Sequence, residues 1–448
     1  MTTGHPHGSA KGKEELAIFG GTPIRVRQWP KWPRADSGTQ RNLLDVLHSS
    51  KWTLSGQADR TLSYERRFSE AFALYCGKKF GIGCGNGTAA LMTALQALEI
   101  GPGDEVVVPG LTWIACASAV ANVGAIPILA DIDPQTLCVT PETLAATLGP
   151  NTRAIVAVHL YSSLAPMPDI MVLANSRGIP VIEDASQAHG GLLGGRRTGA
   201  FGTIGVFSMQ QSKLLSSGEG GACITDDPAL YRRMQQLRAD GRVYADQAGC
   251  ESAGFQREIS ACGEVLGRNF CLSEFHAAIL LDRLLLLDVE NAHRRRNFAR
   301  LGQLLSRLPG IRLVTGAPAE ENTHYRVCLM LEDTLLQGLP ISAVARAMTA
   351  ELRLPVDTVD KPLNANPLYR PHLSPMLSRL AWSASYDARR FILQNAHEAE
   401  RRCLTIPHWG LLGDESDLED IVCALQKVLH LRRSELAEAL PHSTQLLD

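Results

Sequence analysis

The chain has 448 residues, of which 45% are hydrophobic and 20% are charged, and its formal net charge is −2 at pH 7. This is the composition of a globular protein long enough for two or three domains, and without a long basic run it does not point to nucleic acid. The longest apolar stretches, such as residues 113–120, are too short to span a bilayer, so no membrane partner is expected.

The metal-binding side chains follow no metal-site pattern. Eleven cysteines are scattered without a C-x-x-C pair, and the histidines form no H-E-x-x-H motif. We therefore expect no metal site, and we expect free thiols of the kind found in a reducing cytoplasm.

The N-terminal region predicts a tail, an arm and two helices. Residues 1–15 lack the apolar core of a secretory signal and are expected to be disordered. Prolines and glycines predict an extended arm up to residue 33, in which Trp29 and Trp32 either pack or face a substrate. Helices are predicted over 37–49 and, from apolar residues at helical spacing, over 63–75.

From residue 80 onward, strand and helix patterns alternate. This alternation predicts an α/β domain with a mostly parallel sheet and helices on both faces. The helices include one that ends near residue 98 and two at about 141–148 and 169–177. We predict seven strands, at 80–84, 105–108, 126–130, 154–159, 179–184, 204–209 and 221–225.

Two features lie where early strands of this sheet end. The first strand leads into a glycine turn and a helix, whose first amides at Gly87, Thr88 and Ala89 could hold a phosphate group. Many strand–helix turns look similar, so this signal alone is weak. Trp113 follows the second strand and is either a ring-stacking residue or a core residue at a helix start.

Asp184 and Lys213 carry the chemical signal of the sequence. Asp184 ends a predicted strand, at the sheet edge where open α/β sheets bind ligands, although an aspartate there can also cap a turn. Lys213 lies on a loop between two core strands, where desolvation of its amine would favour nucleophilic attack on a carbonyl. Its alternative is an ordinary surface lysine. The pair matches a pyridoxal phosphate (PLP) site, in which a carboxylate faces the pyridinium nitrogen.

The C-terminal part predicts a smaller α+β domain. The polar segment 241–263 is expected to form a long loop near the active site, and an unbroken helix is predicted over 272–305. Beyond it, we predict a strand at 325–331 and helices at 341–351, 387–402 and 418–429. The predicted domains are 16–285 for the arm and the large domain and 286–448 for the small domain.

The segments E-D-A-S-Q-A-H-G and F-S-M-Q-Q-S-K-L-L-S-S-G-E-G-G contain both residues, and they resemble the DegT/DnrJ/EryC1/StrS family of PLP-dependent aminotransferases. The resemblance implies the fold of type I PLP-dependent transferases and a homodimer with shared active sites. Lys213 and Asp184 would then be catalytic. The other implied PLP contacts are Gly87, Thr88, Ala89, Trp113, Gln187, Ser208 and, across the subunit interface, Asn269. The implied substrate contacts are Tyr161, His324 and Tyr325.

The resemblance also implies the reaction. Lys213, where some relatives have histidine and act as dehydratases, favours transamination by a ping-pong mechanism. The family often has arginine where this chain has Cys271, and N-F-C-L-S-E-F resembles the aminocyclitol branch, whose substrate has no diphosphate. This implies transfer from L-glutamine to scyllo-inosose or 2-deoxy-scyllo-inosose in aminoglycoside antibiotic biosynthesis. The alternatives are a nucleotide-sugar aminotransferase, an aminobenzoate-forming relative, and a non-catalytic regulatory homologue.

Overall fold

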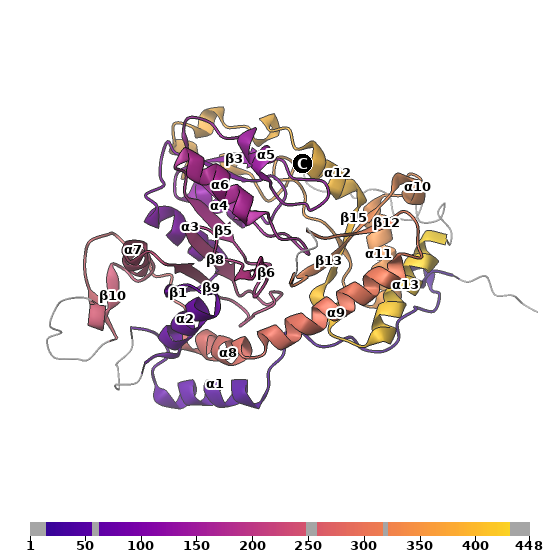
Figure 1. Cartoon of the computed structure of the whole chain (residues 1–448), viewed down its shortest axis with the longest axis horizontal. Coiled ribbons are helices and arrows are strands. Elements are labelled where there is room, and N and C mark those ends of the chain that lie inside the picture. Colours follow the sequence, from indigo (N-terminus) through magenta and orange to yellow (C-terminus); the bar gives the residue numbers. More distant parts are fainter. Residues whose placement is uncertain (1–14, 56–61, 248–257, 317–320, 431–448) are drawn as a thin grey trace, which may run out of the picture.

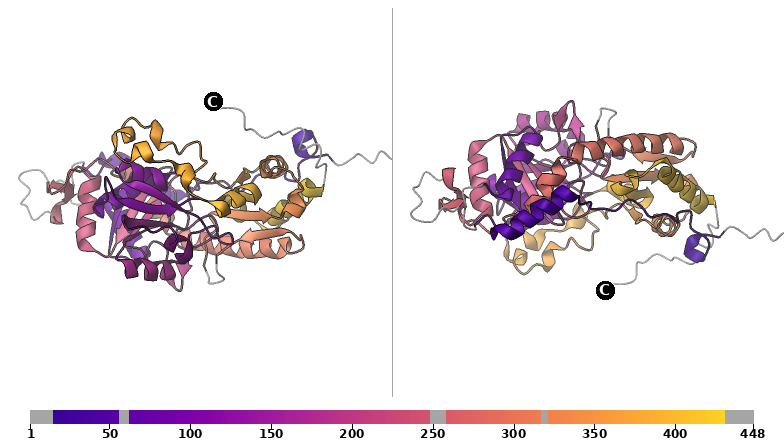
Figure 2. Two further views of the ribbon diagram at one scale, coloured as in Figure 1. Left: turned by 90° about the horizontal axis from the view of Figure 1, so that it is seen from above. Right: turned by 90° about the horizontal axis from the view of Figure 1, so that it is seen from below.

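The computed structural model describes residues 15–55, 62–247, 258–316 and 321–430. The expectation of a disordered tail at 1–15 falls almost wholly outside these residues. The described chain forms two lobes joined by a long helix, and this arrangement is visible from three sides in Figures 1 and 2.

A seven-stranded sheet forms the centre of the larger lobe. Its spatial order is β1-β9-β8-β5-β4-β2-β3, and β9 alone runs antiparallel to its neighbours β1 and β8. The strands are β1 (Phe80–Cys84), β2 (Glu105–Pro109), β3 (Ile126–Ala130), β4 (Thr152–Val158), β5 (Val181–Asp184), β8 (Ile204–Ser208) and β9 (Gly221–Thr225). The prediction of seven strands in a mostly parallel sheet is confirmed.

Both faces of this sheet are buried under helices. The helices of this lobe are α1 (Ser37–Ser49), α2 (Tyr64–Tyr75), α3 (Gly87–Ala97), α4 (Ala115–Asn122), α5 (Pro141–Ala145), α6 (Met167–Arg177), α7 (Pro228–Arg238) and α8 (Glu274–Leu284). On one face, Phe207 of β8 meets Phe72 of α2 edge to face, with ring centroids 4.7 Å apart. On the other face, the thiol of Cys223 on β9 donates to the carbonyl of Ala90 on α3. Side chains that alternate between two apolar layers explain why the strands are apolar almost throughout.

The smaller lobe has its own sheet and core. Its strands β12 (Ile311–Val314), β13 (Arg326–Leu331), β15 (Cys403–Pro407) and β14 (Asp357–Thr358) pair antiparallel in that order. Its helices are α9 (Leu287–Leu305), α10 (Asp333–Leu336), α11 (Ile341–Leu352), α12 (Gln394–Arg402) and α13 (Glu415–His430). Apart from these two sheets, the described residues form two small antiparallel strand pairs, β6 (Leu192–Leu193) with β7 (Arg196–Arg197) and β10 (Arg242–Tyr244) with β11 (Ile259–Ala261).

Two helix predictions are corrected. The helix expected over 272–305 is two helices, α8 and α9, separated at Leu285 and Leu286, whose amides bond three residues back to Asp282 and Arg283. The helix expected over 387–402 begins only at Gln394. Asp131, which follows β3, accepts from the amides of Asn395 and Ala396 and so caps α12 at its first turn.

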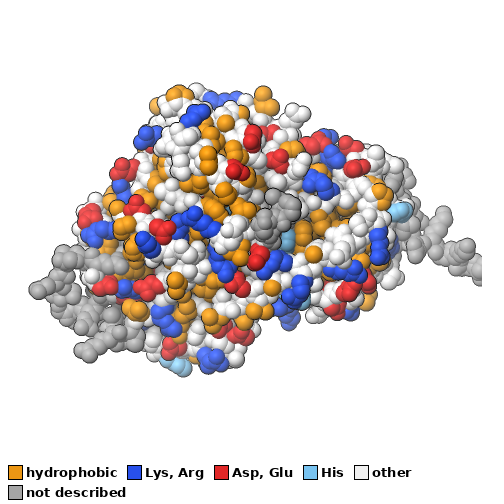
Figure 3. All heavy atoms as spheres, in the orientation of Figure 1, with side chains coloured by type: hydrophobic (Ala, Val, Ile, Leu, Met, Phe, Trp, Pro, Cys, Tyr) orange, Lys and Arg blue, Asp and Glu red, His pale blue; other side chains and the backbone are white. Residues whose placement is uncertain are grey.

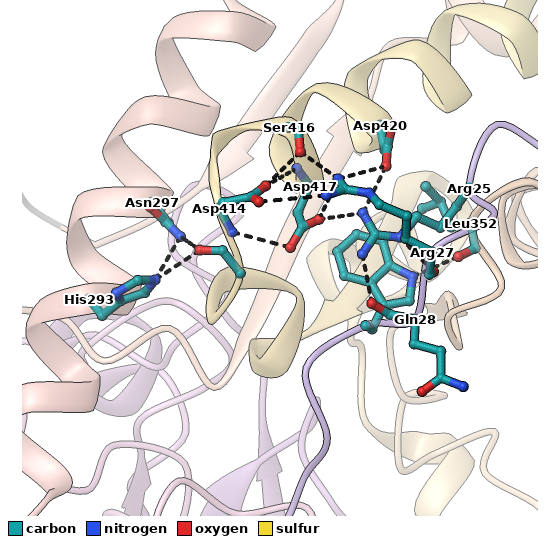
Figure 4. Close-up of polar contacts among 12 residues, drawn as sticks. Arg25, Arg27, Gln28, His293, Asn297, Leu352, Asp414, Ser416, Asp417 and Asp420 are labelled. Carbon is teal, nitrogen blue, oxygen red and sulfur yellow. Dashed lines mark hydrogen bonds and ion pairs between the residues drawn. The ribbon is translucent and has the colours of Figure 1, made fainter.

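The N-terminal arm crosses the smaller lobe before it enters the larger one. Arg25 is 2% exposed, pairs with Asp417 and Asp420 of α13, and its guanidinium carbon lies 4.2 Å from the ring centroid of Trp29 (Figure 4). The indole of Trp29 donates to the carbonyl of Leu352 at 2.6 Å. Trp29 is therefore a packing residue, and it fixes the arm to the small domain.

Charged side chains of both signs are interspersed over the face that Figure 3 shows, without a large patch of one sign. Among the described residues, no helix is both long and apolar enough to cross a membrane. Within the same residues, no group of His, Cys, Asp and Glu side chains is arranged to hold a metal ion.

Candidate active site

A cavity of about 930 Å³ opens at the carboxyl edge of the large sheet. Its walls come from the ends of β4, β5 and β8, from the start of α3 and, across from them, from β13, β14 and β15 of the small domain. The carboxyl ends of parallel strands share one edge, so residues far apart in sequence meet here.

Asp184 is the last residue of β5 and lines this cavity. Its side chain is 5% exposed, and its Oδ1 accepts from the amide of Ser186 at 3.0 Å. Its Oδ2 accepts from the thiol of Cys116 at 3.4 Å. Both contacts fix the carboxylate, while burial and the nearby carboxylate raise the pKa of the Cys116 thiol, which keeps it a donor.

Lys213 reaches the cavity from the loop between β8 and β9. Its Nζ lies 4.5 Å from the ring centroid of Tyr325. The Tyr325 hydroxyl in turn bonds to the Ser212 hydroxyl at 2.8 Å. Burial raises the pKa of Tyr325, but the positive charges of Lys213 and Arg326 and hydrogen bonding to Ser212 and Arg326 together outweigh it, so that the pKa of Tyr325 lies below its usual value. Lys213 and Asp184 line the same cavity, as their positions after core strands predicted.

The start of α3 forms a second wall. Gly87 and Thr88 occupy its first two positions, whose amides have no acceptor one turn earlier in the helix. The amide of Ala89 differs, because the side chain of Asn86 caps it at 2.8 Å. Gly87 lies so close to β8 that an added Cβ would meet the Cβ of Ser208 at 2.7 Å. Two free amides and the Ser208 hydroxyl thus form a cradle for an anion.

Tyr161 and Gln187 form one polar corner of the cavity. Tyr161 has a positive φ of 56°, which is costly for a residue with a side chain. Its amide donates to Oε1 of Gln187 at 2.8 Å, and its hydroxyl donates to Asp360 at 2.8 Å. These bonds hold the strained backbone and place a buried phenol in the cavity wall. Trp113, which is 53% exposed and lies two residues before the start of α4, also lines the cavity.

Three residues singled out in the sequence lie outside the cavity wall. His324 is buried, and its ring stacks on Phe298 with centroids 3.7 Å apart, so it packs in the core and does not face a substrate. Asn269 is exposed on the single chain, and its Oδ1 accepts from the amide of Cys271. The thiol of Cys271 donates to the carbonyl of Arg238.

Of the wall that the small domain contributes, sequence reasoning singled out Tyr325 and missed most of the other residues. Arg326, Asp357, Thr358, Asp360 and Thr405 all line the cavity. Only Arg326 had a nearby signal, because it directly follows Tyr325 in N-T-H-Y-R. The other residues lie in segments with no recognisable motif, and the fold alone brings them to the site.

A buried polar chain supports the lysine loop from behind. Nε of Arg294 donates to Nδ1 of His408 at 3.2 Å, and Nε2 of His408 contacts the carbonyl of Ser212 at 3.1 Å. Because a guanidinium can only donate, Nδ1 of His408 must accept, and Nε2 therefore carries the proton and donates to the loop. Burial and the cation of Arg294 lower the pKa of His408, so the imidazole stays neutral. The indole of Trp32 donates to the preceding carbonyl of this loop, that of Gln211, at 3.1 Å.

Comparison with known proteins identifies close relatives. Residues 33–426 match the model of the DegT/DnrJ/EryC1/StrS aminotransferase family. An L-glutamine:2-deoxy-scyllo-inosose aminotransferase of Streptomyces kanamyceticus is 46% identical over 422 residues, covering 93% of this chain and 97% of that protein. An L-glutamine:scyllo-inosose aminotransferase of Streptomyces griseus is 43% identical over 419 residues, covering 92% and 97%.

Solved structures share the same fold at lower identity. A crystal structure of 3-amino-5-hydroxybenzoic acid synthase has a TM-score of 0.74 at 26% identity, covering 90% of this chain and 99% of that one. A structure of DesI in the presence of its TDP-sugar product has a TM-score of 0.75 at 26% identity, covering 95% and 98%.

Proposed function

The chain belongs to the DegT/DnrJ/EryC1/StrS aminotransferase family, a family of PLP-dependent transferases with fold type I, and we propose that it transfers the amino group of L-glutamine to a keto cyclitol of the scyllo-inosose class. One observation carries the choice of substrate. The relatives named for L-glutamine and 2-deoxy-scyllo-inosose or scyllo-inosose are 43–46% identical over 92–93% of the chain. The structure obtained with a TDP-sugar is only 26% identical.

The cavity residues fit PLP by their chemistry. The amides of Gly87 and Thr88 and the hydroxyl of Ser208 form an anion cradle that suits the phosphate. The buried carboxylate of Asp184 suits a protonated pyridine nitrogen, and the indole of Trp113 supplies an apolar wall for the ring. Lys213 is the amine that holds the cofactor covalently, and Gln187 orients the cavity wall through Tyr161.

When bound, PLP supplies an electron sink for the negative charge that develops at the donor Cα. Asp184 would keep the ring nitrogen protonated, because a carboxylate beside that nitrogen stabilises its positive charge. The carboxylate is held in place by hydrogen bonds from Ser186 and Cys116, and neither of these partners is a cation. Lys213, once its amine is free, would act as general base on the proton of the donor Cα and then, as general acid, would deliver that proton to C4′ of the cofactor. The donor then leaves, and the keto substrate enters the same cavity, as in a ping-pong reaction.

We further propose a homodimer in which Asn269 of each subunit reaches the phosphate in its partner. Support comes from its exposure on the single chain and from the neighbouring Phe270, which lines the cavity. The ten free cysteines among the described residues fit a reducing cytoplasm.

The test is a substrate panel. The PLP-loaded enzyme is incubated with L-glutamine and 2-deoxy-scyllo-inosose, scyllo-inosose or a dTDP-keto sugar, and the amine product is identified by mass spectrometry. We expect amine from the cyclitols only. Amine from the dTDP-keto sugar alone would reassign the enzyme to nucleotide sugars, and no amine from any ketone would contradict the proposal.

A further inference from the structure

A fully buried arginine lies on α9, the helix that joins the two lobes. The side chain of Arg294 has no exposed surface, and its guanidinium meets the carboxylate of Glu290 at the long distance of 3.5 Å. Replacing a buried cation by an apolar side chain of similar volume is often neutral or even stabilising, so packing alone does not account for an arginine here. Its hydrogen bonds indicate what this side chain does.

One side of the guanidinium supports the loop that carries Lys213. Nε of Arg294 donates to Nδ1 of His408 at 3.2 Å. Nε2 of His408 donates to the carbonyl of Ser212, the preceding residue of the loop, at 3.1 Å. The guanidinium carbon also lies 5.3 Å from the ring centroid of Trp32, which meets the His408 ring edge to face at 4.5 Å. Arg294 therefore contacts both rings that donate to adjacent carbonyls of the lysine loop.

The other side of the guanidinium reaches the segment that follows Asp184. Nη1 of Arg294 donates at 2.8 Å to Oδ1 of Asn291, which lies one turn earlier on α9. Nδ2 of Asn291, which is also fully buried, donates to the carbonyl of His189 at 2.8 Å. The next residue, Gly190, has a φ of +78°, and a Cβ added there would lie 2.9 Å from Nδ2 of Asn291. The amide of Asn291 thus packs directly against the backbone of this segment.

We propose that Arg294 and Asn291 are positioning residues, which hold the loop of Lys213 and the segment of Asp184 at a fixed spacing beside α9. The inference rests on the proposed function, because the two side chains need this spacing only if they contact one cofactor, the amine at its aldehyde carbon and the carboxylate at its ring nitrogen. A misplacement of about 1 Å in such a site can cost about a hundredfold in rate.

The elements that make these contacts give the inference a consequence for the whole site. His408 directly follows β15 of the small domain, and Trp32 belongs to the N-terminal arm. The lysine loop itself belongs to the large domain. The amine of Lys213 is therefore in place only when the small domain and the arm are both docked against this loop.

The first test measures how fast the full-length chain, stripped of cofactor, attaches PLP. In this step the amine of Lys213 forms a C=N bond with the aldehyde carbon, and the aldehyde oxygen leaves as water with the two amine protons. Borohydride trapping at timed intervals and peptide mass spectrometry give the rate constant at saturating PLP. His408→Phe keeps a ring but removes both polar contacts, and it should slow attachment about tenfold or more. His408→Gln keeps a donor and an acceptor, and it should stay within about threefold of the parent.

Hydrogen exchange in the same proteins tests which segment each contact holds. His408→Phe should speed exchange about threefold or more in residues 209–217 and leave residues 185–191 unchanged. Asn291→Asp should do the reverse, because a carboxylate still accepts from Arg294 but cannot donate to the carbonyl of His189. A general loss of stability would instead speed exchange in both segments and in β13, and this result would contradict a positioning role.

Arg300→Gln is the matched control. Arg300 lies on the same helix, but its side chain is 38% exposed and pairs with Glu415, so the change should alter neither measurement. Attachment and exchange equal to those of the parent in both His408→Phe and Asn291→Asp would overturn the inference. If His408→Phe does not fold, unchanged exchange of residues 185–191 in Asn291→Asp is enough to overturn it. A parent chain that attaches no PLP at Lys213 would instead defeat the proposed function.

Discussion

Lys213 is the side chain on which the proposed chemistry depends most directly. No other lysine is among the described residues that line the cavity, so Lys213→Ala should lose measurable turnover. Borohydride reduction followed by mass spectrometry should show the cofactor attached to the parent chain and absent from the variant. Lys79→Ala, which changes an exposed lysine, is the control. Normal turnover in Lys213→Ala would remove this lysine from the mechanism.

Asp184 is tested by a change that keeps its shape. Asp184→Asn should retain part of its bound cofactor, because the phosphate cradle at Gly87 and Ser208 is untouched, and it should lose most of its activity. The activity falls because a neutral amide cannot stabilise the positive charge on the ring nitrogen. We expect kcat to decrease by about a hundredfold or more. The measurement is kcat at saturating cofactor, and comparable rates for variant and parent would refute the role.

At the scale of elements, a buried ion pair joins α2 to α7. Glu65 is fully buried and accepts from Arg238 at 2.6 Å, from Tyr244 at 2.8 Å and from the amide of Gly83 at 3.1 Å. Glu65→Gln leaves the Arg238 guanidinium buried without its counter-charge. We expect the free energy of unfolding to fall by about 3 kcal/mol or more.

The control for this prediction is an exposed pair. Glu99, whose side chain is 70% exposed, pairs with Arg233, so Glu99→Gln should change stability by less than about 1 kcal/mol. Urea unfolding followed by circular dichroism gives both values. Equal losses of unfolding free energy in Glu65→Gln and Glu99→Gln would show that the buried pair contributes no more to stability than the exposed pair.

The large sheet could be predicted because its strands carry their signal locally. Runs such as Glu105–Pro109 are apolar, short and bounded by glycine turns, so their type follows from nearby residues. The start of α12 could not be predicted, because its cap comes from Asp131, more than 260 residues earlier. The hairpin at Gly194 and Gly195 had a usable signal, since two glycines with positive φ form the turn, and it was missed.

The same distinction applies to the candidate site. Asp184 and Lys213 belong to motifs in which neighbouring residues specify the position, and both line the cavity. His324 lies one residue from Tyr325 and shares its motif, yet its ring stacks on Phe298 and does not line the cavity. Asp357 and Asp360 reach the cavity only because the small-domain sheet faces the large one. No sequence pattern near either residue predicts that they line the cavity.

At the scale of the whole molecule, the proposed dimer predicts a dependence on concentration. Asn269→Ala should weaken cofactor binding by about 1–3 kcal/mol, because one donor to a charged phosphate is lost while the others remain. Since the contact would cross between subunits, the cofactor retained after dilution should fall more steeply in the variant than in the parent. Equal retention at every protein concentration would contradict the interface role.

Two buried histidines predict a loss of stability in acid. Burial, with help from nearby cations, lowers the pKa of His189 and of His324 to about 3. In the unfolded chain both histidines take up protons near the ordinary pKa of about 6.5, whereas in the folded chain they stay neutral down to a much lower pH. Their contribution to the free energy of unfolding is therefore complete above pH 6.5 and is lost as the pH falls below it. Between pH 6.5 and 5.0 this amounts to about 2 kcal/mol for each histidine.

Thermal unfolding midpoints at pH 7.5 and pH 5.0 test this dependence. His324→Asn should show a smaller decrease between the two pH values than the parent, whatever its stability at pH 7.5. Asparagine is chosen because the backbone here has a positive φ of 52°, which asparagine tolerates. An equal decrease in variant and parent would show that His324 does not contribute to the acid loss.

The arm that crosses the small domain also affects the order in which the molecule can form. Arg25 pairs with Asp417, 392 residues later, and Leu16 and Trp29 belong to the same apolar core as α13. At a synthesis rate of roughly 5–20 residues per second, about 20–80 s pass before the ribosome releases that helix. The large sheet is complete well before then, while the apolar side chains of the arm and of α11 remain in water. A newborn chain thus holds a folded large domain beside a small domain whose apolar core still lacks α13. We expect the chain to depend most on chaperones during this interval.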